Sequence, residues 1–324
     1  MKRRDVLIGL GVGAAFWPPD GRAQQTRKIY RIGLLVSVDN PVMRSADRAL
    51  RDELRAQGFI EGENLVVDQR PTDQTPAALA SAVAEMVRSK VDVIIASTEP
   101  ALQAAVTTGI PIVVSANNYD PIARGYVRSL SHPGGQVTGV VLRQTELAEK
   151  QVELLTQAFP ERKKLAIQWD AISAEQFDAA ERRARAIGLD VISMRFDSPP
   201  YDFAVAFQKM KEGGAQFLLN LSSPFFGRYA QDIVDLSIRH RLPAMFIFRN
   251  YTELGGLLSY GADPVAIFRQ IAICVAKVLR GAKPADLPLE QPNTFELTIN
   301  LKTAKAIGVE LSTAILLRAD VVIE

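Results

Sequence analysis

The sequence predicts an α/β protein built from two doubly wound, Rossmann-like lobes. Short apolar, β-branched runs alternate along the chain with segments of helical periodicity. Several of these runs are apolar without alternation, as expected of strands buried on both faces of a parallel sheet. The runs also fall into two successive sets, and 324 residues are enough for two domains.

The first set of strand–helix units follows residue 28. Its predicted strands are 29–36, 65–69, 91–96 and 112–115, and its helices are 42–57, 76–89 and 100–107. The second set has strands 165–169, 191–196, 217–221 and 244–248, and helices 174–187, 203–212 and 225–239. Pro111 and Pro243 introduce the fourth strand of each set, where proline loses no ladder hydrogen bond. The common pattern predicts two similar lobes.

The remaining segments are interpreted as connections between the lobes. Strands are expected at 137–142, 255–260 and 295–301, and helices at 144–159, 264–280 and 302–307. Residues 281–292 contain three prolines and are expected to be extended. The chain would then pass between the lobes three times and form a hinge. We expect lobe 1 to comprise 28–143 plus 255–283, and lobe 2 to comprise 144–254 plus 284–324.

The N-terminus has the layout of a secretory signal. A basic head at 2–4 precedes an uncharged run at 6–17, and Gly21-Arg22-Ala23 fits cleavage after about Ala23. The apolar run is too short to span a bilayer. The pattern Gly9-x-Gly11-x-x-Ala14 lacks the preceding strand of a dinucleotide site. We therefore expect residues 1–23 to be a signal peptide, with Sec and twin-arginine export both open, and a periplasmic protein with no stable membrane anchor.

Composition excludes several classes of function. Lys and Arg exceed Asp and Glu by two, and loss of residues 1–23 removes that excess, so no positive field for nucleic acid remains. A single cysteine, Cys274, excludes an intrachain disulfide and a cysteine zinc site. Neither His132, in a turn, nor His240, at a helix end, suits a general base, and no nucleophile elbow or phosphate loop occurs. We expect no enzyme, metal or cofactor, and a monomer.

Candidate ligand-binding residues were sought at the carboxyl ends of the strands, where open α/β sheets bind ligands. Most residues there are short and polar, and each alone is also a typical helix cap. Free N–H groups at helix starts favour an anion such as a carboxylate. Glu99 has two readings, a partner for a ligand ammonium or for its own helix dipole. The candidates are Ser37, Ser97, Thr98, Glu99, Asn117, Tyr119, Thr145, Asn220, Ser222 and Tyr251.

Several longer motifs carry a resemblance to a known family. They are QGFIEGENL at 57–65, HPGGQVTGV at 132–140, GGLLSYG at 255–261, GAKPADLP at 281–288 and FELTINLKTAKAIG at 295–308. Together they resemble substrate-binding proteins of ABC transporters of the tryptophan/tyrosine-uptake type. That resemblance implies a type I periplasmic-binding-protein fold, a ligand in the interlobe cleft and an ABC permease in the inner membrane as partner. Thr98 and Pro100 match a turn of that family, and Glu99 departs from it.

These observations give one main functional hypothesis and two alternatives. The main hypothesis is a solute-binding component of an ABC importer that takes a small carboxylate-bearing ligand, an amino acid or an aromatic or branched acid. The first alternative is a periplasmic ligand-sensing protein that feeds a signalling receptor, since the two can share a fold. The second is an exported α/β enzyme.

Overall fold

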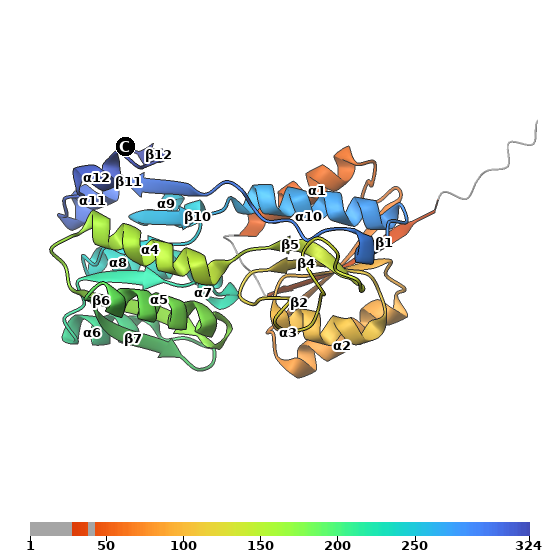
Figure 1. The fold of residues 1–324 in the computed structure, drawn as a ribbon, viewed down its shortest axis with the longest axis horizontal. Coiled ribbons are helices and arrows are strands. Elements are labelled where there is room, and N and C mark those ends of the chain that lie inside the picture. Colours follow the sequence, from red (N-terminus) through yellow and green to blue (C-terminus); the bar gives the residue numbers. More distant parts are fainter. Residues whose placement is uncertain (1–27, 38–42) are drawn as a thin grey trace, which may run out of the picture.

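The computed structural model describes residues 28–37 and 43–324, which form two α/β lobes lying end to end along the long axis (Figure 1). Each lobe is one sheet with helices on both faces. This arrangement confirms the predicted fold class. The predicted signal peptide lies outside the described residues. Within the described residues, no helix combines the length and apolar character needed to cross a bilayer.

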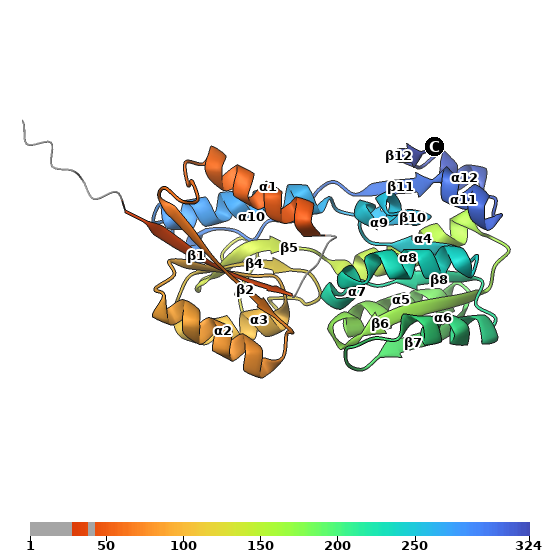
Figure 2. The same cartoon turned by 180° about the vertical axis from the view of Figure 1, so that it is seen from behind.

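Lobe 1 is built on a parallel five-stranded sheet of order β2-β1-β3-β4-β5. Its strands are β1 (Tyr30–Ser37), β2 (Leu65–Thr72), β3 (Val93–Ala96), β4 (Ile112–Ala116) and β5 (Val137–Val141). Helices α1 (Arg44–Ala56) and α10 (Pro264–Leu279) cover one face, and α2 (Pro76–Arg88) and α3 (Glu99–Ala105) cover the other (Figures 1 and 2). Strands β3 to β5 are buried throughout, which explains their unbroken apolar sequences.

Lobe 2 is built on a seven-stranded sheet of order β12-β11-β10-β9-β8-β6-β7, in which only β10 and β11 pair antiparallel. Its strands are β6 (Lys164–Asp170), β7 (Asp190–Phe196), β8 (Phe217–Asn220), β9 (Ala244–Phe246), β10 (Leu258–Gly261), β11 (Glu296–Asn300) and β12 (Val321–Ile323). Its helices are α4 (Gln144–Ala158), α5 (Ala174–Ala186), α6 (Phe203–Glu212), α7 (Pro224–Arg228), α8 (Ala230–Arg239), α9 (Arg249–Glu253), α11 (Leu301–Ile307) and α12 (Thr313–Leu316). Two apolar clusters fill the space between these helices and the two faces of the sheet.

The chain crosses between the lobes three times, as the sequence predicts. The crossings follow β5, β10 and the segment 287–290, which is held against β5 by hydrogen bonds from Thr138 Oγ1 to the Leu287 carbonyl (2.9 Å) and from the Val141 amide to the Glu290 carbonyl (2.8 Å). The lobe boundaries differ from the predicted ones. Strand β10 belongs to lobe 2, where Leu258 pairs with Met245, and residues 284–290 pack on lobe 1. Strand patterns alone do not state which sheet a strand joins.

Short elements account for the other differences from prediction. The single helix expected at 225–239 is two helices, α7 and α8, with a break at Tyr229. Helices α9 and α12 and strand β12 were not predicted, because three to five residues are too few to show a period.

Candidate functional site

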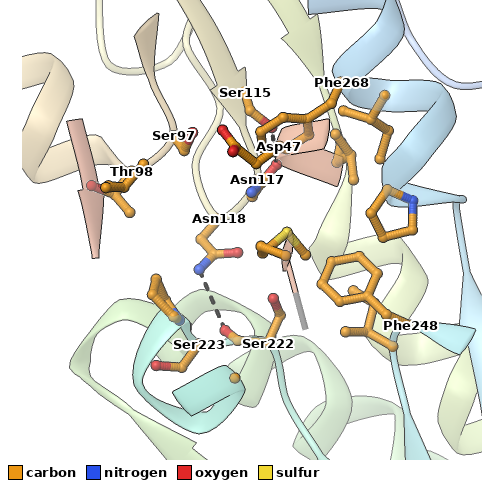
Figure 3. Close-up of a pocket in the computed structure, with 18 of the residues that line it drawn as sticks. Asp47, Ser97, Thr98, Ser115, Asn117, Asn118, Ser222, Ser223, Phe248 and Phe268 are labelled. Atoms are coloured by element: carbon orange, nitrogen blue, oxygen red, sulfur yellow. Dashed lines mark hydrogen bonds between the residues drawn. The ribbon is translucent and has the colours of Figure 1, made fainter. Parts of the chain in front are cut away.

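A cavity of about 440 Å³ lies between the lobes at the carboxyl ends of the strands (Figure 3). Lobe 1 contributes residues of β1 and β2, residues at the ends of β3 and β4, and the N-terminal parts of α1 and α10. Lobe 2 contributes residues that follow β8 and β9. Because both lobes form its wall, a molecule in this cavity would contact both of them. Five of the predicted residues line it: Ser97, Thr98, Asn117, Ser222 and Tyr251.

The lobe 1 wall presents a small polar surface. Ser115 Oγ donates to Asn117 Oδ1 at 2.8 Å, which fixes the Asn117 amide with its Nδ2 as the remaining donor. Ser97 Oγ, at the end of β3, has no hydrogen-bond partner within the described residues. Figure 3 shows Ser97, Asn117 and Asn118 on neighbouring loops at this side of the cavity. The wall can therefore donate hydrogen bonds to an anionic or carbonyl group.

Thr98 has its hydrogen-bonding capacity occupied. Its Oγ1 donates to Gln74 Oε1 at 2.6 Å and accepts from the Ala101 amide at 3.3 Å as the N-cap of α3. Gln74 is buried, adopts a left-handed backbone (φ 62°) and donates to Thr72 Oγ1 at 2.7 Å. A non-glycine residue in this conformation is strained and persists only where its surroundings hold it. Gln74 and Thr98 thus shape the wall of the cavity.

Asp47, in the first turn of α1, supplies an acidic group to the cavity that sequence reasoning missed. Its Oδ2 accepts from Arg51 Nε at 3.1 Å. Its Oδ1 is buried and has no hydrogen-bond partner among the described residues. An unpaired buried carboxylate oxygen is costly, so Asp47 is held in this position at a cost in stability. Asp47 lies on a helix, away from the strand ends, so the rule that ligands bind at strand ends does not locate it.

The lobe 2 wall includes the N-terminus of α7. Ser223 caps this helix by accepting from the Phe225 amide at 3.2 Å, and its hydroxyl donates to Asp170. Asp170 is buried and also accepts from Tyr201 Oη at 3.1 Å and from the Ser173 amide at 3.2 Å. Burial raises the pKa of the Asp170 carboxyl, and these hydrogen bonds partly offset the rise. The network fixes the loop that carries Ser222 and Ser223.

Apolar side chains also line the cavity. Phe248 of lobe 2 and Phe268 of α10 come from different lobes (Figure 3), and Met43 also lines the cavity. Tyr251 stacks on Phe246 with centroids 4.6 Å apart, and its burial raises the pKa of the phenol. The aromatic residues Phe248 and Phe268 were not among the predicted candidates, since a single phenylalanine is usually a packing residue. The cavity is thus lined by both polar and aromatic side chains.

Four predicted residues lie away from the cavity. Glu99 stands in the first turn of α3, as its helix-dipole interpretation predicts, and it also pairs with Arg124 (3.3 Å) and accepts from Tyr126 Oη (3.1 Å). Tyr119 is buried edge-to-face against the ring of Tyr126, with centroids 5.9 Å apart. Asn220 is buried in β8, and Thr145 is in the first turn of α4 at the hinge. The side chain of Ser37 lies outside the described part of the structure.

Other chemistry-bearing groups do not converge on the cavity. Across residues 28–37 and 43–324, no three His, Cys, Asp or Glu side chains are grouped so as to hold a metal ion. Cys274 is buried on α10, and burial raises the pKa of its thiol to about 11, so the thiol stays protonated at neutral pH.

Two α/β lobes with mostly parallel sheets, three crossings and a cavity between the lobes define a class of protein, the type I periplasmic binding proteins. The family model described as "ABC transporter substrate binding protein" matches residues 31–323. The chain therefore belongs to this family of substrate-binding proteins, which confirms the resemblance found in the sequence motifs.

Individual relatives agree with this assignment. The chain is 23% identical over 305 residues to a tyrosine-binding protein of Clostridioides difficile (strain R20291), covering 91% of this chain and 86% of the relative. A conserved domain protein of Vibrio cholerae has a TM-score of 0.82 at 25% identity, over 91% of this chain and all of that one. An ABC domain from Streptococcus pneumoniae, solved in complex with L-Trp, has a TM-score of 0.80 at 24% identity with the same coverage.

Proposed function

We propose that this protein is the ligand receptor of an ABC importer and that its ligand is an amino acid with an aromatic side chain. One observation carries the proposal: the Asp47 carboxylate and the free donors of the polar wall line the same cavity as Phe248 and Phe268. The ligand ammonium would pair with Asp47, and its carboxylate would accept from Ser97 and the Asn117 amide. Its ring would pack between the aromatic residues of the two lobes.

The size of the cavity supports a ligand of this class. Its volume of about 440 Å³ lies within the usual range for small-molecule sites, about 300–1,000 Å³. The names of two relatives, a tyrosine-binding protein and a domain bound to L-Trp, point to the same chemistry. Glu99, which the sequence offered as the ammonium partner, is replaced in this role by Asp47.

Export and delivery complete the proposed function. The signal-like segment 1–23 supports a periplasmic location and cleavage after about Ala23, and family membership supports an ABC permease as partner. The protein would act as a monomer that binds its ligand, closes and releases it unchanged. It would need no cofactor, since no bond is made or broken.

Isothermal titration calorimetry against L-tyrosine, L-tryptophan, L-phenylalanine, L-leucine and D-ribose tests the proposed function. We expect one aromatic amino acid to bind per chain with a dissociation constant at or below the micromolar range, more tightly than leucine, and ribose not to bind. Binding of ribose alone, or of no amino acid, would overturn the assignment of the ligand class.

A further inference from the structure

Beside the cavity, a buried glutamine joins the two lobes. Gln176 on α5 of lobe 2 is 2% exposed and does not line the cavity. Its Nε2 donates to Asn118 Oδ1 of lobe 1 at 2.9 Å and to the Ser222 carbonyl at 3.2 Å, and its Oε1 accepts from the Ser222 amide at 3.2 Å. Asn118 Nδ2 donates to the same Ser222 carbonyl at 3.5 Å, as Figure 3 shows. One side chain thus ties a pocket loop of each lobe to the other.

An ion pair crosses between the lobes next to this glutamine. Arg124 of lobe 1 pairs with Glu175, which precedes Gln176 on α5. Glu99 holds the Arg124 guanidinium from its own lobe at 3.3 Å, and Tyr126 Oη donates to Glu99 at 3.1 Å. The carboxylate that the sequence singled out therefore orients an arginine toward the opposite lobe. Glu99 therefore influences the contact between the lobes through Arg124, without lining the cavity itself.

We propose that Asn118, Gln176, Arg124 and Glu175 form an interlobe latch that sets how long the ligand stays bound without selecting which ligand binds. The inference rests on the proposed function, because only a closing cleft needs a latch. When the lobes separate, the four side chains lose their partners in the other lobe and return to water. The latch therefore stabilises the closed form by the same amount for every ligand that permits closure.

Removal of the buried part of the latch should act on dissociation. In Gln176→Leu, which keeps a side chain of similar size, we expect the dissociation rate of the bound amino acid to rise about tenfold and the association rate to change little. The affinity order of the calorimetry panel should stay unchanged, because Gln176 does not touch the cavity. Gln231→Leu, on the exposed side of α8 in the same lobe, is the matched control and should leave both rates as they are.

The charged part of the latch should depend on salt. Arg124 and Glu175 are about half exposed, so their attraction is screened as ionic strength rises. In Glu175→Gln we expect the dissociation rate at low salt to rise about threefold and its salt dependence to flatten. Glu181→Gln removes a carboxylate from the same helix that pairs only within lobe 2, with Arg185, and should keep the salt dependence of the natural protein.

Small-angle X-ray scattering of the ligand-free protein gives a readout that needs no ligand. We expect Gln176→Leu to have a larger radius of gyration than the natural chain, and a saturating ligand to remove the difference.

A natural protein that binds its ligand while Gln176→Leu keeps the same dissociation rate and radius would overturn the latch and leave the proposed function intact. Failure of every panel ligand to bind, with the variant still more open, would overturn the proposed ligand and keep the latch. A changed affinity order in Gln176→Leu would show that Gln176 selects ligands and would also contradict the latch.

Discussion

Asp47 carries the most specific chemical expectation at the scale of single residues. Its Oδ2 accepts from Arg51, its Oδ1 is buried without a hydrogen-bond partner among the described residues, and the residue lines the cavity. Replacing the charge should therefore affect ligands that carry an ammonium more than those that lack one.

We expect Asp47→Asn to weaken binding of the aromatic amino acid about 30-fold, about 2 kcal/mol, because a charge-assisted hydrogen bond is lost. Binding of its deaminated analogue, a 3-arylpropionate, should change less than threefold. Calorimetry with both ligands measures the difference. Asp52→Asn, an exposed carboxylate on the same helix, is the control. Equal losses for the two ligands would show that Asp47 shapes the wall without pairing with an ammonium.

The Asp170 carboxyl leads to a prediction of how the free energy of unfolding changes with pH. Burial raises the pKa of its carboxyl in the folded state, so the folded state holds the proton more tightly than the unfolded state. The contribution of the Asp170 carboxyl to the free energy of unfolding is fully present below its pKa in the unfolded state. It is lost as the pH rises through its pKa in the folded state. In urea unfolding, the stability of the natural protein relative to Asp170→Asn should therefore be greatest near pH 4 and smaller at pH 7. A difference that is constant or grows with pH would contradict this account.

The residues found from the sequence share one property. Ser97, Asn117 and Ser222 follow strands within two residues, and the rule that ligands bind at strand ends locates such positions. Asp47 and Phe268 project from helices, where the sequence does not state which turn faces the cleft. Glu99 does follow a strand, but Arg124 turns it away from the cavity, and that contact spans residues far apart in sequence.

At the scale of elements, Gly139 shows how closely β4 and β5 approach. It has φ 135°, and a Cβ there would lie 2.2 Å from the Val114 carbonyl oxygen of the neighbouring strand. Because this contact would be with backbone, no movement of a neighbouring side chain could relieve the clash. Position 139 therefore requires glycine. The close approach of the two strands that explains this requirement is not visible in the sequence motif.

We expect Gly139→Ala to lower the free energy of unfolding by about 3 kcal/mol, because it combines a strained backbone with overpacking. Gly135→Ala, four residues earlier, adds a Cβ whose nearest contact is 4.0 Å away and should cost well under 1 kcal/mol, as an unhindered loop substitution. Thermal or urea unfolding compares the two. Similar losses in both variants would show that the close approach to Val114 is not what requires glycine.

Long elements were predictable from periodicity and short ones were not. Strands β1 to β4 and helices α2 and α10 lie close to their expected bounds, because each shows a run or a full period. The break at Tyr229 and the short strand β12 depend on packing that the local pattern does not contain.

At the scale of the whole molecule, two lobes and three crossings followed from the order of strands and helices. The membership of β10 in the second sheet did not, because that strand is followed at once by α10, which packs on the first. The crossings place the cavity between two bodies, so binding and closure are coupled through the hinge.

A crystal structure of the protein grown with the tightest-binding amino acid of the calorimetry panel tests the central claim most directly. The account predicts an intact ligand enclosed in the cavity, in contact with both lobes, with its nitrogen within hydrogen-bonding distance of the Asp47 carboxylate and its ring against Phe248. A ligand bound to one lobe alone, bound outside the cavity or covalently altered would contradict it.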